Sequence, residues 1–150
     1  MTTRTHLLAL FCIGTATLCP AEVTISLAPT ATQDELAAHK ETLEGLLQIV
    51  VEINKHLATV QDETTADEAG DAICLLVKEL DAQSVAYTQL PQPTPEQAEK
   101  INAWFTEHQA PMEEMLQHVE RLQNEDPAFF GSGPLISAVI LVGGALGGAQ

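Results

Sequence analysis

The sequence predicts an all-α fold: an up-down-up three-helix bundle followed by a short apolar C-terminal fourth helix or tail. Three observations support this prediction. Apolar residues recur at heptad spacing along three long segments, each segment opens with a helix-capping pattern, and short links join the segments. Short links make consecutive helices antiparallel, so we expect helices over 33–61, 65–90 and 95–124 to cross at shallow angles.

Each expected helix starts at a threonine that is followed three residues later by Glu or Gln. In this capping box the hydroxyl accepts a hydrogen bond from a free backbone N–H, and the Glu or Gln side chain reaches back to the cap residue. Pro95 in the third box suits the first helical position, where an N–H would lack a helical partner. The boxes are Thr32-Gln33-Asp34-Glu35, Thr65-Ala66-Asp67-Glu68 and Thr94-Pro95-Glu96-Gln97.

The heptad positions place one stripe of residues on each expected helix and so define the predicted core. Such a seam also allows an intermolecular coiled coil, but short loops favour packing within one chain. The stripes are Leu36, His39, Leu43, Leu46, Val50, Ile53, Leu57 and Val60; Ala66, Ala69, Ile73, Leu76, Leu80, Gln83, Tyr87 and Leu90; and Ala98, Ile101, Phe105, His108, Met112, Met115, Val119 and Leu122.

Pro111 interrupts the third segment. A proline inside a helix removes one backbone hydrogen bond and crowds a carbonyl one turn earlier, here that of Glu107. Because the apolar stripe continues in phase beyond Pro111, we expect one kinked helix. A true break into two shorter helices is the alternative.

Residues 1–21 have the three parts of a cleavable signal peptide. Arg4 lies in the first part, the segment 7–18 is apolar, and Cys19-Pro20-Ala21 predicts cleavage after Ala21. A buried N-terminal helix and a lipoprotein signal with lipidated Cys19 are the alternatives. Residues 22–31 follow as an expected leader, either extended along the bundle or disordered.

Export would make the protein periplasmic or secreted and would change its composition. Cleavage removes Cys12 and Cys19, so Cys74 remains without an internal disulfide partner and most simply serves as a small apolar residue. The formal charge changes from −15 to −16, because Arg4 is lost and all 21 acidic residues stay. A surface this acidic disfavours nucleic acid and anionic membranes as partners.

The C-terminal segment 127–150 contains no charged residue, in contrast to the expected bundle over 32–126. We expect it to form a short helix on the bundle, with Phe129 and Phe130 anchoring the connector. A membrane-inserting tail and a flexible or self-associating tail are the less favoured alternatives, since the apolar run is too short to span a bilayer.

The sequence contains no recognisable catalytic or metal-binding motif. No two histidines are four residues apart, and no Cys-x-x-Cys, phosphate loop or nucleophile elbow occurs. His56 and His118 are expected at a similar height on parallel helices, which leaves a shared metal site as the minor alternative to solvated side chains. We therefore assign no catalytic, cofactor-binding or metal-binding residue and expect no cofactor.

Two stretches resemble known exported proteins. The stretch Thr94-Pro95-Glu96-Gln97-Ala98-Glu99-Lys100-Ile101 resembles the Leu-Thr-Pro-Glu-Gln helix start of periplasmic stress chaperones of the Spy/CpxP type, with Pro93 in place of the leucine. That resemblance implies a small exported helical protein that binds unfolded clients on a concave face. The stretch 57–80 is similar to small exported bacterial helical proteins of unassigned role.

Together these features predict an exported, non-enzymatic helical protein that acts as an interaction or structural module in the cell envelope. A Spy-like chaperone or a metal-responsive binding protein is the alternative. We expect a protein partner, no nucleic acid, and membrane contact through the C-terminal segment only as the less favoured case. The sequence leaves the oligomeric state open.

Overall fold

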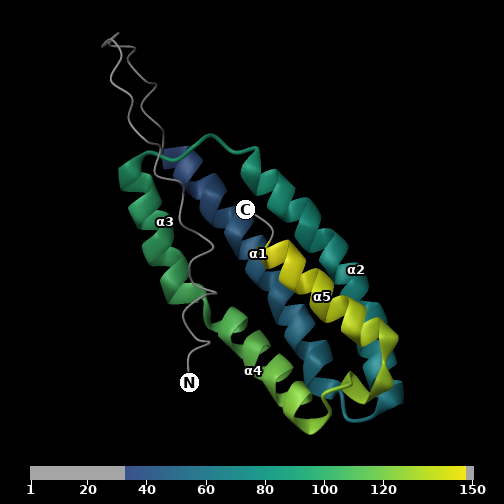
Figure 1. Cartoon of the computed structure of the whole chain (residues 1–150). Helices are drawn as coiled ribbons and strands as arrows, with labels where there is room; N and C mark the ends of the chain where they lie inside the picture. The colour runs from purple at the N-terminus through teal and green to yellow at the C-terminus, as the bar shows by residue number, and fades with distance from the viewer. Residues whose placement is uncertain (1–32, 148–150) are drawn as a thin grey trace, which may run out of the picture.

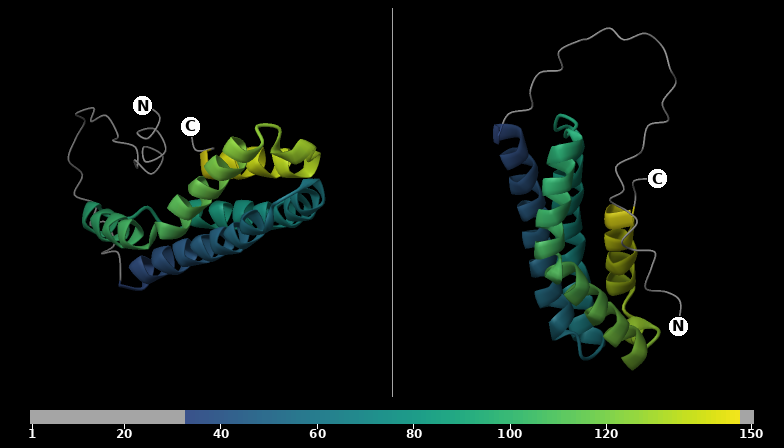
Figure 2. Two further views of the ribbon diagram at one scale, coloured as in Figure 1. Left: turned by 90° about the horizontal axis from the view of Figure 1, so that it is seen from below. Right: turned by 90° about the vertical axis from the view of Figure 1, so that its left-hand side faces the viewer.

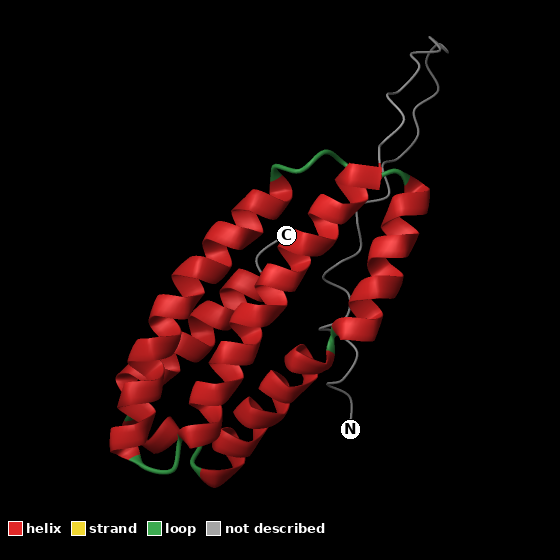
Figure 3. Cartoon of the chain, turned by 180° about the vertical axis from the view of Figure 1, so that it is seen from behind, coloured by secondary structure: helices red, strands yellow, loops and turns green. Residues whose placement is uncertain are grey.

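A computed structural model describes residues 33–147, and all of its regular structure in that range is helical (Figure 3). The helices are α1 Gln33–Thr59, α2 Glu63–Thr88, α3 Pro95–His108, α4 Ala110–Glu125 and α5 Gly133–Gly147, with the short 3-10 turn η2 Phe129–Gly131 before α5. The predicted all-α class is confirmed. The three-helix arrangement is not, because this range contains five α-helices. The expected signal peptide, leader and Thr32 capping box lie outside the described residues.

Helix α1 forms the centre of the bundle (Figure 1). It packs against α2 along one side and against α3 and then α4 along the other, while α5 packs mainly against α2. Figure 2 shows α5 lying over one half of the bundle only, with α3 at the other half. The alternation of helix direction along the chain therefore ends with the short helix α5, which covers one end of the core.

Helix α2 begins at Glu63, two residues earlier than predicted, and its N-cap lies three residues earlier than expected. Asp62 is its N-cap, because the Asp62 carboxylate accepts from the Thr65 backbone N–H at 2.9 Å and the Thr65 hydroxyl accepts from the Asp62 N–H at 3.0 Å. The backbone N–H and the hydroxyl of Thr65 both donate to the carboxylate and lower the pKa of Asp62. The expectation of Thr65 as the cap was wrong, since the carboxylate of Asp62 supplies an earlier capping box.

Helix α3 begins as predicted. The backbone N–H of Gln97 donates to the Thr94 hydroxyl at 3.3 Å, and the Thr94 N–H donates to the Gln97 side-chain oxygen at 2.9 Å. Pro95 occupies the first turn, where it costs no helical hydrogen bond. The capping box over 94–97 therefore sets the end of the loop and the start of the helix together.

The third predicted helix is broken rather than kinked. Helix α3 ends at His108 and α4 begins at Ala110, with Gln109 between them, and the two axes diverge in Figure 2. Pro111 has no N–H to continue the ladder of α3. The buried side chain of Asn54 donates to the Pro111 carbonyl at 2.8 Å, which ties the first turn of α4 to α1. The break was the alternative to the kink that we expected.

The predicted stripes supply most of the core, which extends across α1, α2, α4 and α5. His108 is an exception, because it is exposed where α3 ends and its ring stacks on Trp104 with centroids 4.3 Å apart. Gln83 is also exposed. The stripe members that are buried are His39, Leu43, Val50, Ile53, Leu57, Val60, Ala66, Ala69, Ile73, Leu80, Ile101, Met115 and Leu122.

Candidate interaction surface

Helix α5 carries large apolar side chains on both of its faces, and only one face is buried. Leu135, Ala138 and Val142 point into the bundle and join the core. The opposite side, called here the outer face of α5, is exposed: Ile136 by 37%, Ile140 by 67% and Leu141 by 49%. Exposed large apolar side chains on one helix face are typical of contact surfaces. The outer face of α5 comprises Ile136, Ser137, Ile140, Leu141, Gly143 and Gly144.

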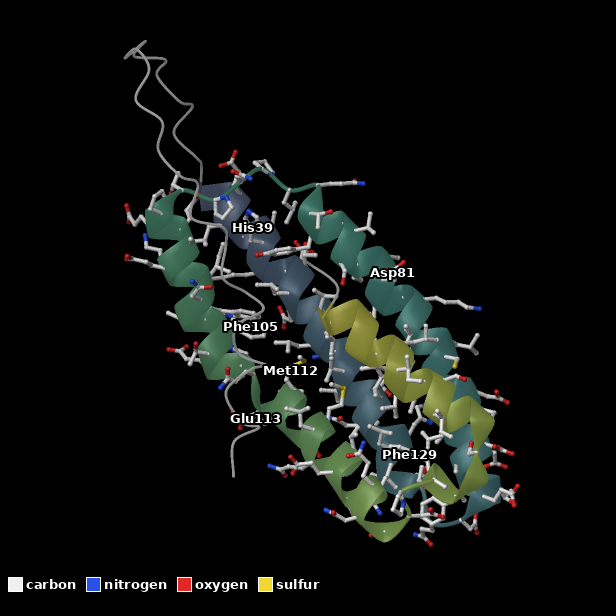
Figure 4. All side chains as sticks on the ribbon, viewed as in Figure 1. His39, Asp81, Phe105, Met112, Glu113 and Phe129 are labelled. Atoms are coloured by element: carbon white, nitrogen blue, oxygen red, sulfur yellow. The ribbon has the colours of Figure 1, made fainter. Side chains whose placement is uncertain are left out.

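The start of α5 is held by its own connector. The buried Ser132 hydroxyl accepts from the Leu135 backbone N–H at 3.1 Å, which caps the helix. Phe129 belongs to the core, and Phe130 packs against it. Figure 4 shows Phe129 at the end of the bundle where the chain turns from α4 into α5. The anchoring role expected for the two aromatic residues is therefore seen in the structure.

Gly70 brings α5 close to α2. A Cβ atom added to Gly70 would lie 2.8 Å from the Leu135 Cα and closer still to the Leu135 nitrogen and the Pro134 carbonyl carbon. By contrast, nothing lies within 4 Å of a Cβ added to Gly143 or Gly144. The small residue that permits close packing is thus on α2, and Gly143 and Gly144 of α5 face away from the bundle.

Beneath α5 the core contains a small void of about 20 Å³. Its lining is entirely apolar, so a water molecule there would find no hydrogen-bonding partner. A void of this size holds no ligand, and α5 acts here as a cover over the core. The void is lined by Leu57, Ile73, Met115, Val119, Val139 and Val142.

A second feature is a shallow groove of about 390 Å³ between α1 and α2. Small residues create it, since Gly45, Ala82 and Ala86 leave space beside Ile49. Its polar lining consists of Glu79 and Gln83. The groove could receive an apolar side chain, but it brings together no set of groups for acid–base or nucleophilic chemistry.

The electrostatics also indicate no reactive cleft. The pKa of Glu96 is lowered by the hydrogen bond and charge of Lys100, and burial raises the pKa of Tyr87. Together with Asp62, the residues whose pKa is shifted lie at the starts of α2 and α3 or, for Tyr87, in a half-buried ring. None of them lies on the outer face of α5. Segment 127–150 carries no charge, whereas the whole chain carries −15.

The histidines do not form a metal centre within residues 33–147, where no group of three or more potential ligands gathers. Arg121 donates to the Leu57 carbonyl at 3.0 Å, and Asn54 donates to the Pro111 carbonyl, so the C-terminal half of α1 packs against α4, the helices that carry His56 and His118. His118 lies 3.7 Å from Glu114 on its own helix. His39, at the opposite end (Figure 4), donates from its Nε2 to the Pro91 carbonyl in the α2–α3 loop at 3.0 Å and packs edge-on against Tyr87.

The structure shows the C-terminal helix that the sequence analysis favoured, packed on the bundle through α2. No helix within residues 33–147 is long and apolar enough to cross a membrane. Sequence reasoning did not identify Asn54, Gly70 or the outer face of α5. The available signal was Gly70 itself, because a glycine inside a predicted helix can mark a place where another segment packs closely against it.

The class of protein that this geometry defines is an acidic helical bundle with an exposed apolar helix face. Comparison with known proteins finds no matching family model, no matching curated protein and no matching solved structure.

Proposed function

We propose that this protein is an exported, non-enzymatic interaction module of the cell envelope that binds a protein partner through the outer face of α5. The observation that carries the proposal is the exposure of Ile136, Ile140 and Leu141 on a helix whose other face is already buried. Export is supported by the signal-peptide pattern of residues 1–21.

The position of α5 suits a contact role. Ser132, Phe129 and Gly70 hold the helix on α2, so its outer face is presented by a fixed scaffold. A fixed apolar face loses little conformational entropy when a partner covers it. The absence of charge across 127–150 further separates this face from the acidic remainder of the surface. Apolar side chains without charges among them are what the core of a protein interface requires.

The test is affinity capture from the cell envelope with the full chain expressed and exported by its own N-terminus. Intact mass should show cleavage after Ala21. Ile140→Glu should reduce recovery of a specific partner at least about tenfold, because a buried unpaired charge costs several kcal/mol at an interface.

The matched control is Leu75→Glu, which adds the same charge at another exposed apolar residue, 63% exposed on α2. It should leave capture unchanged. Equal capture by wild type and Ile140→Glu would place the contact elsewhere on the protein. An uncleaved N-terminus would contradict the export part of the proposal.

A Spy-like chaperone is the second candidate, and the α1–α2 groove is the observation that favours it. Gly45, Ile49 and Ala86 give the groove an apolar floor that could hold side chains of an unfolded client. Suppression of client aggregation by the wild-type protein, lost on Ala86→Glu and kept on Ile140→Glu, would support this function over partner binding through α5.

A further inference from the structure

We propose that the outer face of α5 binds the same face of a second copy of this chain, forming a weak two-fold dimer. The inference rests on the proposed function, in which this face is the contact surface, and it names the partner. A two-fold contact is self-complementary, so the same patch on both copies must tolerate being brought together.

Charge favours this face over the others. The chain has 21 acidic and six basic residues, and helices α1 to α4 carry the acidic excess. Contact between two copies through those helices would bring carboxylates together. Segment 127–150 has no charged residue, so two α5 faces can meet without like-charge repulsion at the contact.

The shape of the face also suits a copy of itself. Ile140 stands one helical turn before Gly144, and nothing lies within 4 Å of a Cβ placed on Gly143 or Gly144. In an antiparallel crossing, Ile140 of one copy can lie over the glycines of its partner. A large apolar side chain over a position without a Cβ allows two helices to approach closely, in the manner of a knob in a hole.

A bilayer is the competing occupant, and the dimensions count against it. Helix α5 has 15 residues and is about 22 Å long, short of the roughly 30 Å of a bilayer core. No basic residue in 127–150 is available to meet lipid phosphates, and the acidic body would be repelled by an anionic surface.

The same length sets the strength of the dimer. Two helix faces about 22 Å long bury a few hundred Å² per copy, below the roughly 800 Å² per partner of a standard interface. We therefore expect a dissociation constant on the order of 100 μM rather than a permanent dimer. Added salt should strengthen it, because salt screens the repulsion between the two acidic bodies.

Sedimentation equilibrium of the exported protein from 10 μM to 1 mM tests the proposal; those concentrations bracket the expected constant of about 100 μM. Wild type and Leu75→Glu should pass from monomer to dimer over this range. Ile140→Glu, with the same added charge, should weaken the dimer at least about tenfold. Circular dichroism melting of the three proteins verifies that each is folded.

Three results would overturn the proposal: a wild-type monomer at every concentration, a dimer that Ile140→Glu leaves intact, or equal weakening by Leu75→Glu. Flotation of monomeric wild type with phosphatidylcholine vesicles, lost in Ile140→Glu, would assign the face to lipid instead. If wild type is monomeric while Ile140→Glu still abolishes capture of an envelope protein, the proposed function stands and only the second copy as partner is rejected.

Discussion

Gly70→Ala should detach α5 from the bundle and destabilise the protein by about 3 kcal/mol, although it adds a single methyl group. The atoms that this methyl would meet are backbone atoms of Pro134 and Leu135, which cannot rotate away as a side chain could. Overpacking of this kind usually costs about 1–3 kcal/mol, and rigid neighbours favour the upper end of that range. The gain of about 0.5–1 kcal/mol from removing a helical glycine offsets only part of the cost.

Gly45→Ala is the matched control. A Cβ on Gly45 would lie 3.5 Å from the Gln83 side-chain oxygen, an ordinary contact with a flexible group. This change should therefore be neutral or stabilising by up to about 1 kcal/mol. Urea unfolding followed by circular dichroism measures both variants. Equal stabilities for the two would show that α5 does not press against Gly70.

Asn54→Asp should destabilise the protein by about 3–5 kcal/mol at pH 7. Asn54 is 3% exposed, and its amide nitrogen donates to the Pro111 carbonyl at 2.8 Å and to a Glu114 carboxylate oxygen at 3.4 Å. A carboxylate there would face two acceptors, one of them charged, with no donor in place of the lost amide. The link between α1 and the start of α4 would be replaced by repulsion.

This loss should depend on pH with a definite sign. Burial and the nearby Glu114 would raise the pKa of the new carboxyl in the folded state above the unfolded value of about 3.9. The loss of unfolding free energy is therefore complete above the folded-state pKa of the new carboxyl. It becomes smaller as pH falls toward about 4, where the protonated acid can donate to the Pro111 carbonyl.

Asn54→Leu is the control for the pH dependence. It removes the same hydrogen bond without adding a charge, so it should cost about 1–2 kcal/mol at every pH. Unfolding free energies at pH 7 and pH 4.5 make the comparison. An Asn54→Asp deficit that does not shrink on acidification relative to Asn54→Leu would mean that the site is open to water.

Features of the fold that depend on local sequence were largely predictable. The Thr94–Gln97 capping box can be recognised from four consecutive residues. The burial of Val50, Ile53 and Leu80 follows from the spacing of the apolar stripes to which they belong. The start of α2 was misplaced because both Asp62 and Thr65 are residues that can cap a helix. In the structure the Asp62 carboxylate accepts from the Thr65 N–H, so Thr65 lies inside the helix and is not its cap.

Features that depend on a neighbouring helix were not predictable. In the sequence, Asn54 is a polar residue next to the core position Ile53, with nothing to mark it. Its role depends on α4, which brings the Pro111 carbonyl within hydrogen-bonding distance. The same contact holds the first turn of α4, next to the break at Gln109. In α5, large apolar side chains lie on both faces, so their pattern alone does not show which side is buried; in the structure Val142 faces inward and Ile140 outward, and Gly70 permits the close approach at Leu135.

The central claim, that α5 is docked with one apolar face buried and the other free, is tested most directly by thiol labelling of two neighbouring residues. Leu141 is 49% exposed and Val142 only 7%, although both are apolar and adjacent in the chain. Each is replaced by cysteine in turn, and labelling at that peptide is followed by mass spectrometry. Leu141→Cys should react at the rate of an open thiol and Val142→Cys at least about tenfold more slowly, because its reaction requires local opening of the helix. Equal rates at the two positions would show that α5 is not docked and would contradict the account.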